Sequence, residues 1–120
     1  MTPDELVDEY ARAFRTADAD LARSLIAPGA VIWHNFDQVE RDIDASLGEL
    51  PRMYERFADL ELEELERFAL ADGIGTRIVL RGTDRATDEP MVSHQVKLYR
   101  VRDGRIARVE EYVAPRVATS

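Results

Sequence analysis

The 120-residue chain contains no cysteine, one lysine and two histidines. Without cysteine it has no disulfide, no thiolate metal ligand and no cysteine nucleophile. It has no apolar run long enough to span a bilayer and no basic-then-apolar signal pattern at its start, so we expect a cytoplasmic protein. Sixteen basic residues against 24 acidic ones give a net charge of −8, which argues against binding to nucleic acid or to an anionic membrane.

The length fits one domain, over residues 1–120 with an ordered core at about 3–115. Hydrophobic residues make up 45% of the chain and charged residues 33%, which is typical of a soluble globular protein. The last residues, 114–120, are expected to form a loose tail.

Capping patterns predict two helices at the start of the chain. Thr2 and Glu5 have the spacing of a capping box, and Pro3 occupies the first helical position between them. Apolar residues recur at spacings of three and four, which predicts one amphipathic helix from about residue 3 to 16. Asp18 is then a typical N-cap for a second, shorter helix.

Proline and glycine divide the next part of the chain. Pro28-Gly29 is expected to stop the second helix, and the β-rich residues 30–35 predict a strand. A third helix is expected to begin at Asp42 or Asp44. Pro51 falls inside its apolar pattern and must remove a backbone hydrogen bond, which predicts either a kink or two abutting helices.

The second half of the chain has the period of two that is typical of strands. A bulge near Glu64 would explain why the alternation slips there, and Asp72-Gly73 and Asp103-Gly104 predict turns. Strands are expected after residue 58 and over residues 75–83, 91–102 and 105–113. Helices followed by antiparallel strands predict the α+β class, with the three helices covering one face of a sheet of about five or six strands.

The segment from Asp18 to Asp37 resembles the SnoaL-like members of the nuclear transport factor 2-like superfamily, which also includes ketosteroid isomerases. The stretch from Tyr99 to Tyr112 resembles the last hairpin of that family. The resemblance covers about residues 3–115. It implies a cone-shaped α+β barrel, in which a strongly curved, mostly antiparallel sheet wraps around three N-terminal helices. It also implies a pocket at the open end of the cone and a homodimer formed through the outer face of the sheet. Strand alternation places Val79, Tyr99 and Val101 on that outer face, where they would face water in a monomer.

The resemblance also implies roles for single residues. Ketosteroid isomerases have an aspartate base at the end of the first strand, and an ungapped match places His34 there. Their oxyanion-donating tyrosine on the first helix matches Tyr10. Their second aspartate, on the penultimate strand, has no counterpart in residues 92–99. Steroid isomerisation is therefore in doubt for this chain, although the pocket is not.

Strand alternation gives a second view of the same residues. Ile32 and His34 share one face of their strand, so His34 is expected inside the fold. His94 alternates with apolar residues and is expected inside as well. Glu111 is also expected inside, where Arg77, Arg81 and Arg100 are candidate partners. The two histidines would either bracket a ligand or be core groups satisfied by single hydrogen bonds. A metal bound by both would need Glu111 as a third ligand, and nothing in the spacing demands it.

Aromatic residues are further candidates for ligand contacts. Tyr10 would either pack in the core or donate a hydrogen bond to a ligand oxygen. Trp33 and Phe36 would lie near the mouth of the pocket, or Trp33 would lie at a dimer contact. Tyr54, on the third helix, completes the expected ligand-binding group with Trp33, Phe36 and Glu111.

These observations lead to one main hypothesis and two alternatives. The main hypothesis is a cofactor-independent proton-transfer enzyme, of the isomerase, hydrolase or cyclase type, acting on a small and mostly apolar organic molecule. His34 would be the base, and Tyr10 and His94 would be donors. The first alternative is a non-catalytic ligand-binding protein or a dimeric accessory module. The second is a fold whose pocket is filled by its own side chains.

Overall fold

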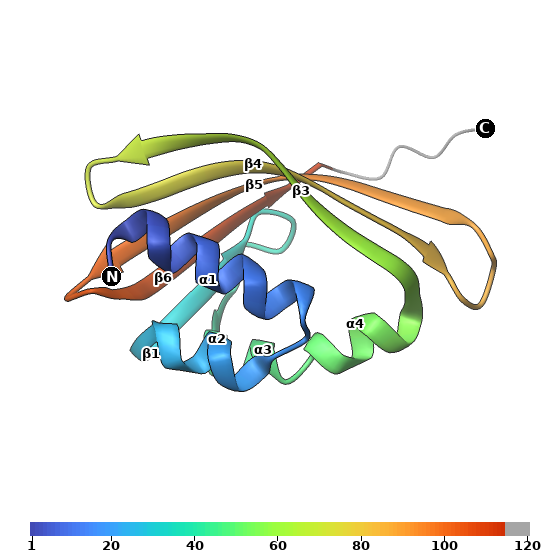
Figure 1. Ribbon diagram of the computed structural model, residues 1–120, viewed down its shortest axis with the longest axis horizontal. Coiled ribbons are helices and arrows are strands. Elements are labelled where there is room, and N and C mark those ends of the chain that lie inside the picture. Colours follow the sequence, from blue (N-terminus) through green and yellow to red (C-terminus); the bar gives the residue numbers. More distant parts are fainter. Residues whose placement is uncertain (115–120) are drawn as a thin grey trace.

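The computed structural model describes residues 1–114, and of the expected tail only Ala114 falls within them. The elements are α1 (Pro3–Arg15), α2 (Ala19–Leu25), β1 (Ile26–His34), β2 (Glu40–Asp42), α3 (Ile43–Leu47), α4 (Leu50–Arg56), β3 (Phe57–Leu70), β4 (Gly73–Asp84), β5 (Pro90–Arg102) and β6 (Arg105–Val113). The helices lie in the hollow of a single curved sheet (Figure 1). The α+β class is therefore confirmed.

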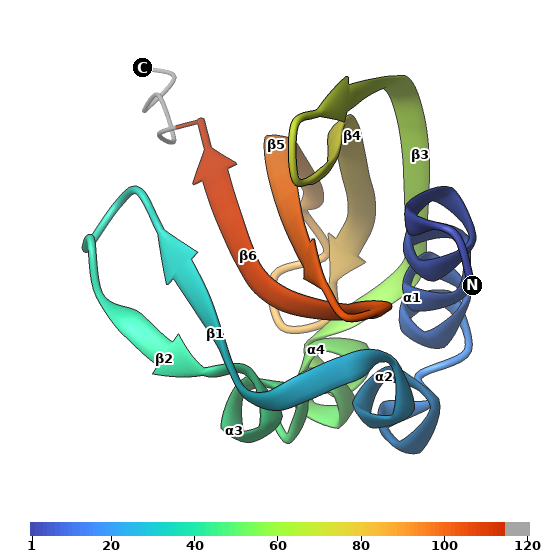
Figure 2. The same cartoon turned by 90° about the vertical axis from the view of Figure 1, so that its left-hand side faces the viewer.

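The sheet has six strands in the order β2-β1-β6-β5-β4-β3. Every neighbouring pair is antiparallel except β1 and β6, which run parallel. The strands curl around the helices as a cone that stays open between the edge strands β2 and β3 (Figure 2).

The predicted caps of the first two helices are confirmed. The Thr2 side chain accepts from the backbone N–H of Glu5, and the Glu5 side chain accepts from the backbone N–H of Thr2. Pro3 begins α1, and the Asp18 side chain caps α2 by accepting from the N–H of Leu21. These bonds satisfy N–H groups that have no partner inside a helix.

The third predicted helix is two abutting helices. Asp42 caps α3, which ends at Leu47, and α4 begins three residues later at Leu50. Pro51 lies in the first turn of α4, where its missing N–H would have no helical partner in any case. The proline therefore lies at the start of a separate helix, α4, and does not kink a single longer helix.

The prediction that Pro28-Gly29 stops the second helix is wrong. That helix already ends at Leu25, and Pro28 and Gly29 lie within β1. Gly29 has φ of 74°, and the register between β1 and β6 shifts between Ile26 and Val31. The left-handed glycine thus forms an irregularity inside the strand, because a residue without Cβ adopts that conformation at little cost.

The predicted irregularity and turns of the meander are confirmed. The β3–β4 register shifts between Glu64 and Glu66, where the bulge was expected. Asp72-Gly73 leads from β3 into β4. Asp103 and Gly104 both have positive φ, of 53° and 72°, as a two-residue hairpin turn requires.

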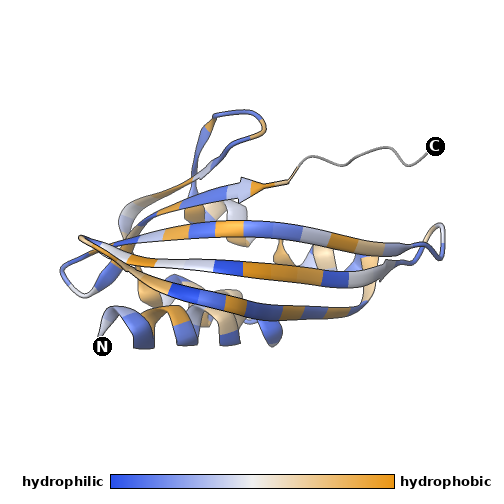
Figure 3. Ribbon diagram, turned by 90° about the horizontal axis from the view of Figure 1, so that it is seen from above, coloured by the Kyte–Doolittle hydropathy of each residue, from blue (hydrophilic) through white to orange (hydrophobic). Residues whose placement is uncertain are grey.

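The facing of β5 was predicted wrongly. Val92 is 57% exposed and His94 is exposed, whereas Tyr99 is buried in the core. In the register of the sheet His94 lies opposite Val79, and Val96 lies opposite Tyr112. Val92, His94 and Val96 therefore lie toward the convex face, whereas Gln95, Lys97 and Tyr99 point into the hollow. The alternation along the long strands is visible in Figure 3.

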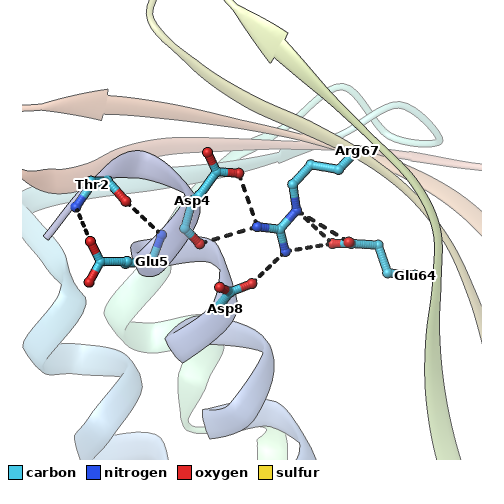
Figure 4. A network of polar contacts seen from close by, with 6 residues as sticks. All are labelled: Thr2, Asp4, Glu5, Asp8, Glu64 and Arg67. Carbon is cyan, nitrogen blue, oxygen red and sulfur yellow. Dashed lines mark hydrogen bonds and ion pairs between the residues drawn. The ribbon is translucent and has the colours of Figure 1, made fainter.

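The core lies between the helices and the strands β1, β4, β5 and β6. It is made by Leu6, Val7, Ala13, Ala22, Leu25, Ile26, Ala30, Ile32, Ile43, Leu47, Ile74, Tyr99, Ile106 and Val109. At its edge Arg67 joins β3 to α1, because its guanidinium donates to Asp4, Asp8 and Glu64 (Figure 4). No helix among the described residues is long and apolar enough to cross a membrane.

Candidate functional site

A cavity of about 350 Å³ lies between the concave face of the sheet and the helices. Its wall is apolar over most of its extent, and one group of polar side chains, His34, Lys97 and Glu111, lies where β1, β6 and β5 meet. The lining residues are Tyr10, Phe14, Ile32, His34, Phe36, Arg41, Ser46, Leu47, Glu49, Leu50, Met53, Leu62, Ile78, Leu80, Gln95, Lys97 and Glu111. An apolar pocket with a few convergent polar groups is the usual form of a small-molecule site.

His34 and Glu111 form the centre of this polar end. They lie opposite each other on the parallel strands β1 and β6, and the Nε2 of His34 is 3.0 Å from Oε2 of Glu111. The two side chains are only 18% and 15% exposed. The Nδ1 of His34 is buried and has no hydrogen-bond partner among the described residues. The neutral tautomer with its proton on Nε2 can donate to Glu111 and keeps its lone pair on Nδ1.

Lys97 is the third member of the group. It lies opposite Glu111 on β5, with Nζ 3.5 Å from Oε1 of Glu111. Its side chain is 13% exposed, and Nζ lies 5.9 Å from the centre of the Phe14 ring. His34, Glu111 and Lys97 therefore lie side by side on three neighbouring strands, with the carboxylate in the middle.

The charges of this group are set by competing effects. Burial alone would raise the pKa of Glu111, but the Lys97 ammonium and the hydrogen bond from His34 outweigh it, so the pKa falls below its ordinary value. Burial alone would lower the pKa of Lys97, but the Glu111 carboxylate outweighs it, so the pKa rises above its ordinary value. The two residues are therefore an ion pair at neutral pH.

Tyr10 reaches the cavity from α1. Its ring packs edge-on against Tyr99, with centroids 5.8 Å apart. Burial raises the pKa of Tyr10 well above its ordinary value, so the hydroxyl stays protonated and remains a donor. The placement of Tyr10, His34 and Glu111 around one cavity agrees with the sequence-based expectation that all three point inward.

The aromatic candidates separate into three positions. Phe36 lies at the rim, 67% exposed, with its ring centroid 4.9 Å from that of His34. Trp33 lies on the convex face against Tyr112, so its expected place in the pocket lining is wrong. Tyr54 is not among the lining residues, because its hydroxyl donates to the backbone oxygen of Phe14 and ties α4 to α1.

The expectation that His94 points inward is also wrong. His94 lies with Tyr112 and Asn35 in a shallow depression on the convex face. The two histidines therefore lie on opposite faces of the sheet and cannot share one ligand. Within residues 1–114 no group of three or more His, Asp or Glu side chains could hold a metal ion. Arg77, Arg81 and Arg100, considered as partners of Glu111, pair instead with Glu66, Glu63, Asp72 and Glu110.

Sequence reasoning missed Lys97 and Gln95. These residues point inward from β5, on the face where His94 was expected. A signal was present, because Lys97 is the only lysine beside fifteen arginines. Arginine supplies the surface ion pairs of this chain, so a single lysine within a strand is unusual. The signal was overlooked because the apolar residues at the alternate positions of β5 were assigned to the inner face, which left Lys97 outside.

Comparison with known proteins places the chain in a family. A family model of the SnoaL-like domain matches residues 7–109, and the chain belongs to that family. Its fold is the nuclear transport factor 2-like, or ketosteroid isomerase-like, cone. No curated protein sequence matches the chain.

Solved structures show the same fold. IdmH from Streptomyces antibioticus, for which a polyketide cyclase role has been suggested, is 26% identical, with a TM-score of 0.81 and coverage of 94% of this chain and 92% of that one. AclR from Streptomyces galilaeus, for which a hydroxylase role has been suggested, is 20% identical (TM-score 0.82; 95% and 79% covered). A hypothetical protein with a ketosteroid isomerase-like fold from Catenulispora acidiphila, in complex with trimethylamine, is 16% identical (TM-score 0.76; 90% and 84% covered). Together the family and the cavity support a protein that binds a small molecule.

Proposed function

We propose that the protein is a cofactor-independent proton-transfer enzyme that acts on a small, mostly apolar carbonyl compound, with His34 as the base. The observation that carries the proposal is the arrangement of the imidazole. One nitrogen donates to a buried carboxylate, and the other is buried with a free lone pair beside an apolar cavity. A base that is oriented by a carboxylate is the arrangement that proton transfer needs.

The proposed step moves one proton and one electron pair. A C–H bond next to the carbonyl group breaks, the proton goes to Nδ1 of His34, and the electron pair moves onto the carbonyl oxygen to give an enolate. Glu111 stabilises the imidazolium that forms, as the carboxylate of a catalytic triad does. His34 then returns the proton to a different atom of the substrate. The neutral Tyr10 hydroxyl donates a hydrogen bond to the substrate.

The wall of the cavity supports the proposed ligand class. Phe14, Leu50, Met53, Leu62 and Leu80 offer an apolar surface, and the volume of about 350 Å³ fits a molecule of one or two rings. The likeness to IdmH supports a polyketide-like compound, in which carbonyl groups activate neighbouring C–H bonds.

A second candidate is a non-catalytic ligand-binding protein or dimeric accessory module. The observation that favours it is the buried state of the base, since burial of Nδ1 is also compatible with a structural histidine. In either case we propose a homodimer formed through the convex face, where Phe68, Val92 and Tyr112 are exposed. A cytoplasmic location stays a prediction from the sequence.

Exchange of α-protons in deuterated water tests the proposal without knowledge of the natural substrate. The bicyclic ketone 2-tetralone is the probe, and NMR follows its loss of α-proton signal. We expect His34→Gln to lower the protein-catalysed exchange rate by about 10²–10⁴-fold, and Tyr10→Phe to lower it less. His94→Gln is the matched control and should leave the rate unchanged, because His94 lies on the other face of the sheet.

Thermal melts of the same variants separate a catalytic from a structural role. A catalytic His34 predicts lost exchange with a melting temperature close to that of the wild type. A large fall in melting temperature, with exchange reduced only as far as the folded fraction, would contradict it. If 2-tetralone binds but exchanges no faster than in buffer, the non-catalytic alternative is supported.

A further inference from the structure

The cavity contains a positive charge that the proposed proton transfer does not use. Lys97 is the only lysine of the chain, and its side chain is almost completely buried beside Glu111 and Phe14. Removing an ammonium group from water costs several kcal/mol. The other basic residues of this chain are arginines. A lysine ammonium is a more compact and more strongly hydrated charge than a guanidinium, and at this buried position it loses that hydration.

The Lys97 ammonium has hydrogen-bonding capacity to spare. It carries three N–H donors, and within residues 1–114 the only carboxylate within 4 Å of Nζ is that of Glu111, at 3.5 Å. That same carboxylate also accepts from His34 at 3.0 Å, through its other oxygen. Nζ also lies 5.9 Å from the centre of the Phe14 ring, which offers only its π-face. Donors are therefore left for an acceptor in the cavity.

We propose that Lys97 binds a negatively charged oxygen of the ligand, either a carboxylate or the enolate that forms during proton transfer. Lys97, Glu111 and His34 have a combined charge of zero when the imidazole is neutral. After transfer, the imidazolium pairs with Glu111 and the enolate oxygen pairs with Lys97. The carboxylate thus exchanges its main partner, and both new charges have a neighbour of opposite sign.

This inference rests on the proposed use of the cavity as a ligand site, but its test is independent of catalysis. The probes are 2-naphthoate and 2-naphthalenemethanol, which share one apolar body and differ in the charge of the oxygen group. Their dissociation constants are measured by calorimetry at pH 7. The variant is the double substitution Lys97→Met with Glu111→Gln, which removes the ammonium and keeps the combined charge at zero. Replacing both partners also avoids an unpaired buried charge. Arg102→Gln, exposed at the end of β5, is the control for loss of one positive charge.

The wild-type protein is expected to bind 2-naphthoate about 10–100-fold more tightly than 2-naphthalenemethanol, as for a hydrogen bond to a charged group. The double variant should lose this preference and still bind the alcohol, and Arg102→Gln should keep the preference. Equal binding of both probes to the wild type, or an unchanged preference in the double variant, would overturn the role of Lys97. The assay measures binding alone, so its result can be interpreted even if the protein catalyses no α-proton exchange. If exchange is active but the protein shows no preference for the anion, only the role of Lys97 is rejected.

Discussion

At the scale of single residues, the candidate site depends on contacts between strands that are distant in the sequence. The inward positions of His34 and Glu111 follow from strand alternation. Their hydrogen bond depends on the parallel register of β1 against β6, across 77 positions of the chain (111 − 34). No local pattern encodes that register, so sequence reasoning proposed arginines as partners of Glu111. Its actual partners come from the two strands that flank it.

The buried ion pair predicts how stability depends on pH. The pKa of Glu111 is lowered in the folded state, so the group contributes stability that is present above its ordinary value of 4.5 and is lost as pH falls through the folded-state pKa. The pKa of Lys97 is raised, so its contribution is present below 10.5 and is lost as pH rises through the folded-state pKa. The pair is therefore intact across the neutral range.

We expect Glu111→Gln to flatten the acid limb of a plot of melting temperature against pH. The variant should be less stable than the wild type at pH 7, by about 3–5 kcal/mol, because Lys97 is left without its partner. The difference should shrink as pH falls below 4.5, because the unfolded wild-type chain then binds a proton at Glu111 while the folded carboxylate stays ionised down to its lowered pKa. Glu61→Gln, on the exposed side of β3, should keep the wild-type profile. A difference that is constant from pH 3 to 7 would contradict the coupling.

At the scale of elements, local sequence patterns predicted the ends of helices and strands well, but predicted less well which face of the sheet each side chain lies on. The caps at Thr2 and Asp18 and the turn at Asp103-Gly104 depend on neighbours within three residues, and all are confirmed. The facing of β5 depends on which side of the sheet the helices cover. Apolar residues were expected inside, but the inner face of β5 lines a cavity with polar groups, and Val92 lies outside.

The turn between β3 and β4 brings Gly73 against β5, and this contact predicts the effect of a small substitution. A Cβ at Gly73 would lie 1.8 Å from the backbone oxygen of Tyr99, which cannot move away without shifting β5. Gly73→Ala is therefore expected to destabilise the protein by about 2–3 kcal/mol, as overpacking does. Gly48→Ala is the control, since its Cβ would lie 3.2 Å from the nearest atom, the backbone oxygen of Ala45. Chemical denaturation of both variants measures the difference, and equal stabilities would show that β5 gives way easily.

At the scale of the whole molecule, the fold could be predicted because several independent patterns agree. Capped helices come first, a meander of strands follows, and the segment from Asp18 to Asp37 resembles a known family. Each helix can cover only the hollow of the curved sheet, so the convex face is left without a helical layer (Figures 1 and 2). Sequence reasoning expected Val79, Tyr99 and Val101 on that outer face. Of these, Tyr99 belongs to the inner core, and Val101 packs against it.

The outer face has a different apolar surface, which supports the proposed dimer. Trp33 and Tyr112 pack together there, with ring centroids 5.3 Å apart, and Val92 on β5 and Phe68 on β3 are exposed as well. A stable interface buries about 1,200–2,000 Å² in total, with aromatic residues near its centre. The central strands β4, β5 and β6 offer a continuous surface for such a contact, whereas the net charge of −8 would oppose association through the acidic outer edge of β3.

We expect light scattering with size-exclusion chromatography to give the mass of a dimer, about twice 13.6 kDa, at micromolar concentration. Tyr112→Arg places a charge within the aromatic pair and should shift the protein to the monomer, because an unpaired charge at a desolvated interface is costly. Val39→Arg, at an exposed apolar residue of the β1–β2 loop, introduces the same charge outside the sheet and should leave the dimer intact. Circular dichroism of both variants must match the wild type, so that loss of the dimer reflects the interface and not the fold. A wild-type monomer, or a dimer that survives Tyr112→Arg, would exclude this face as the interface.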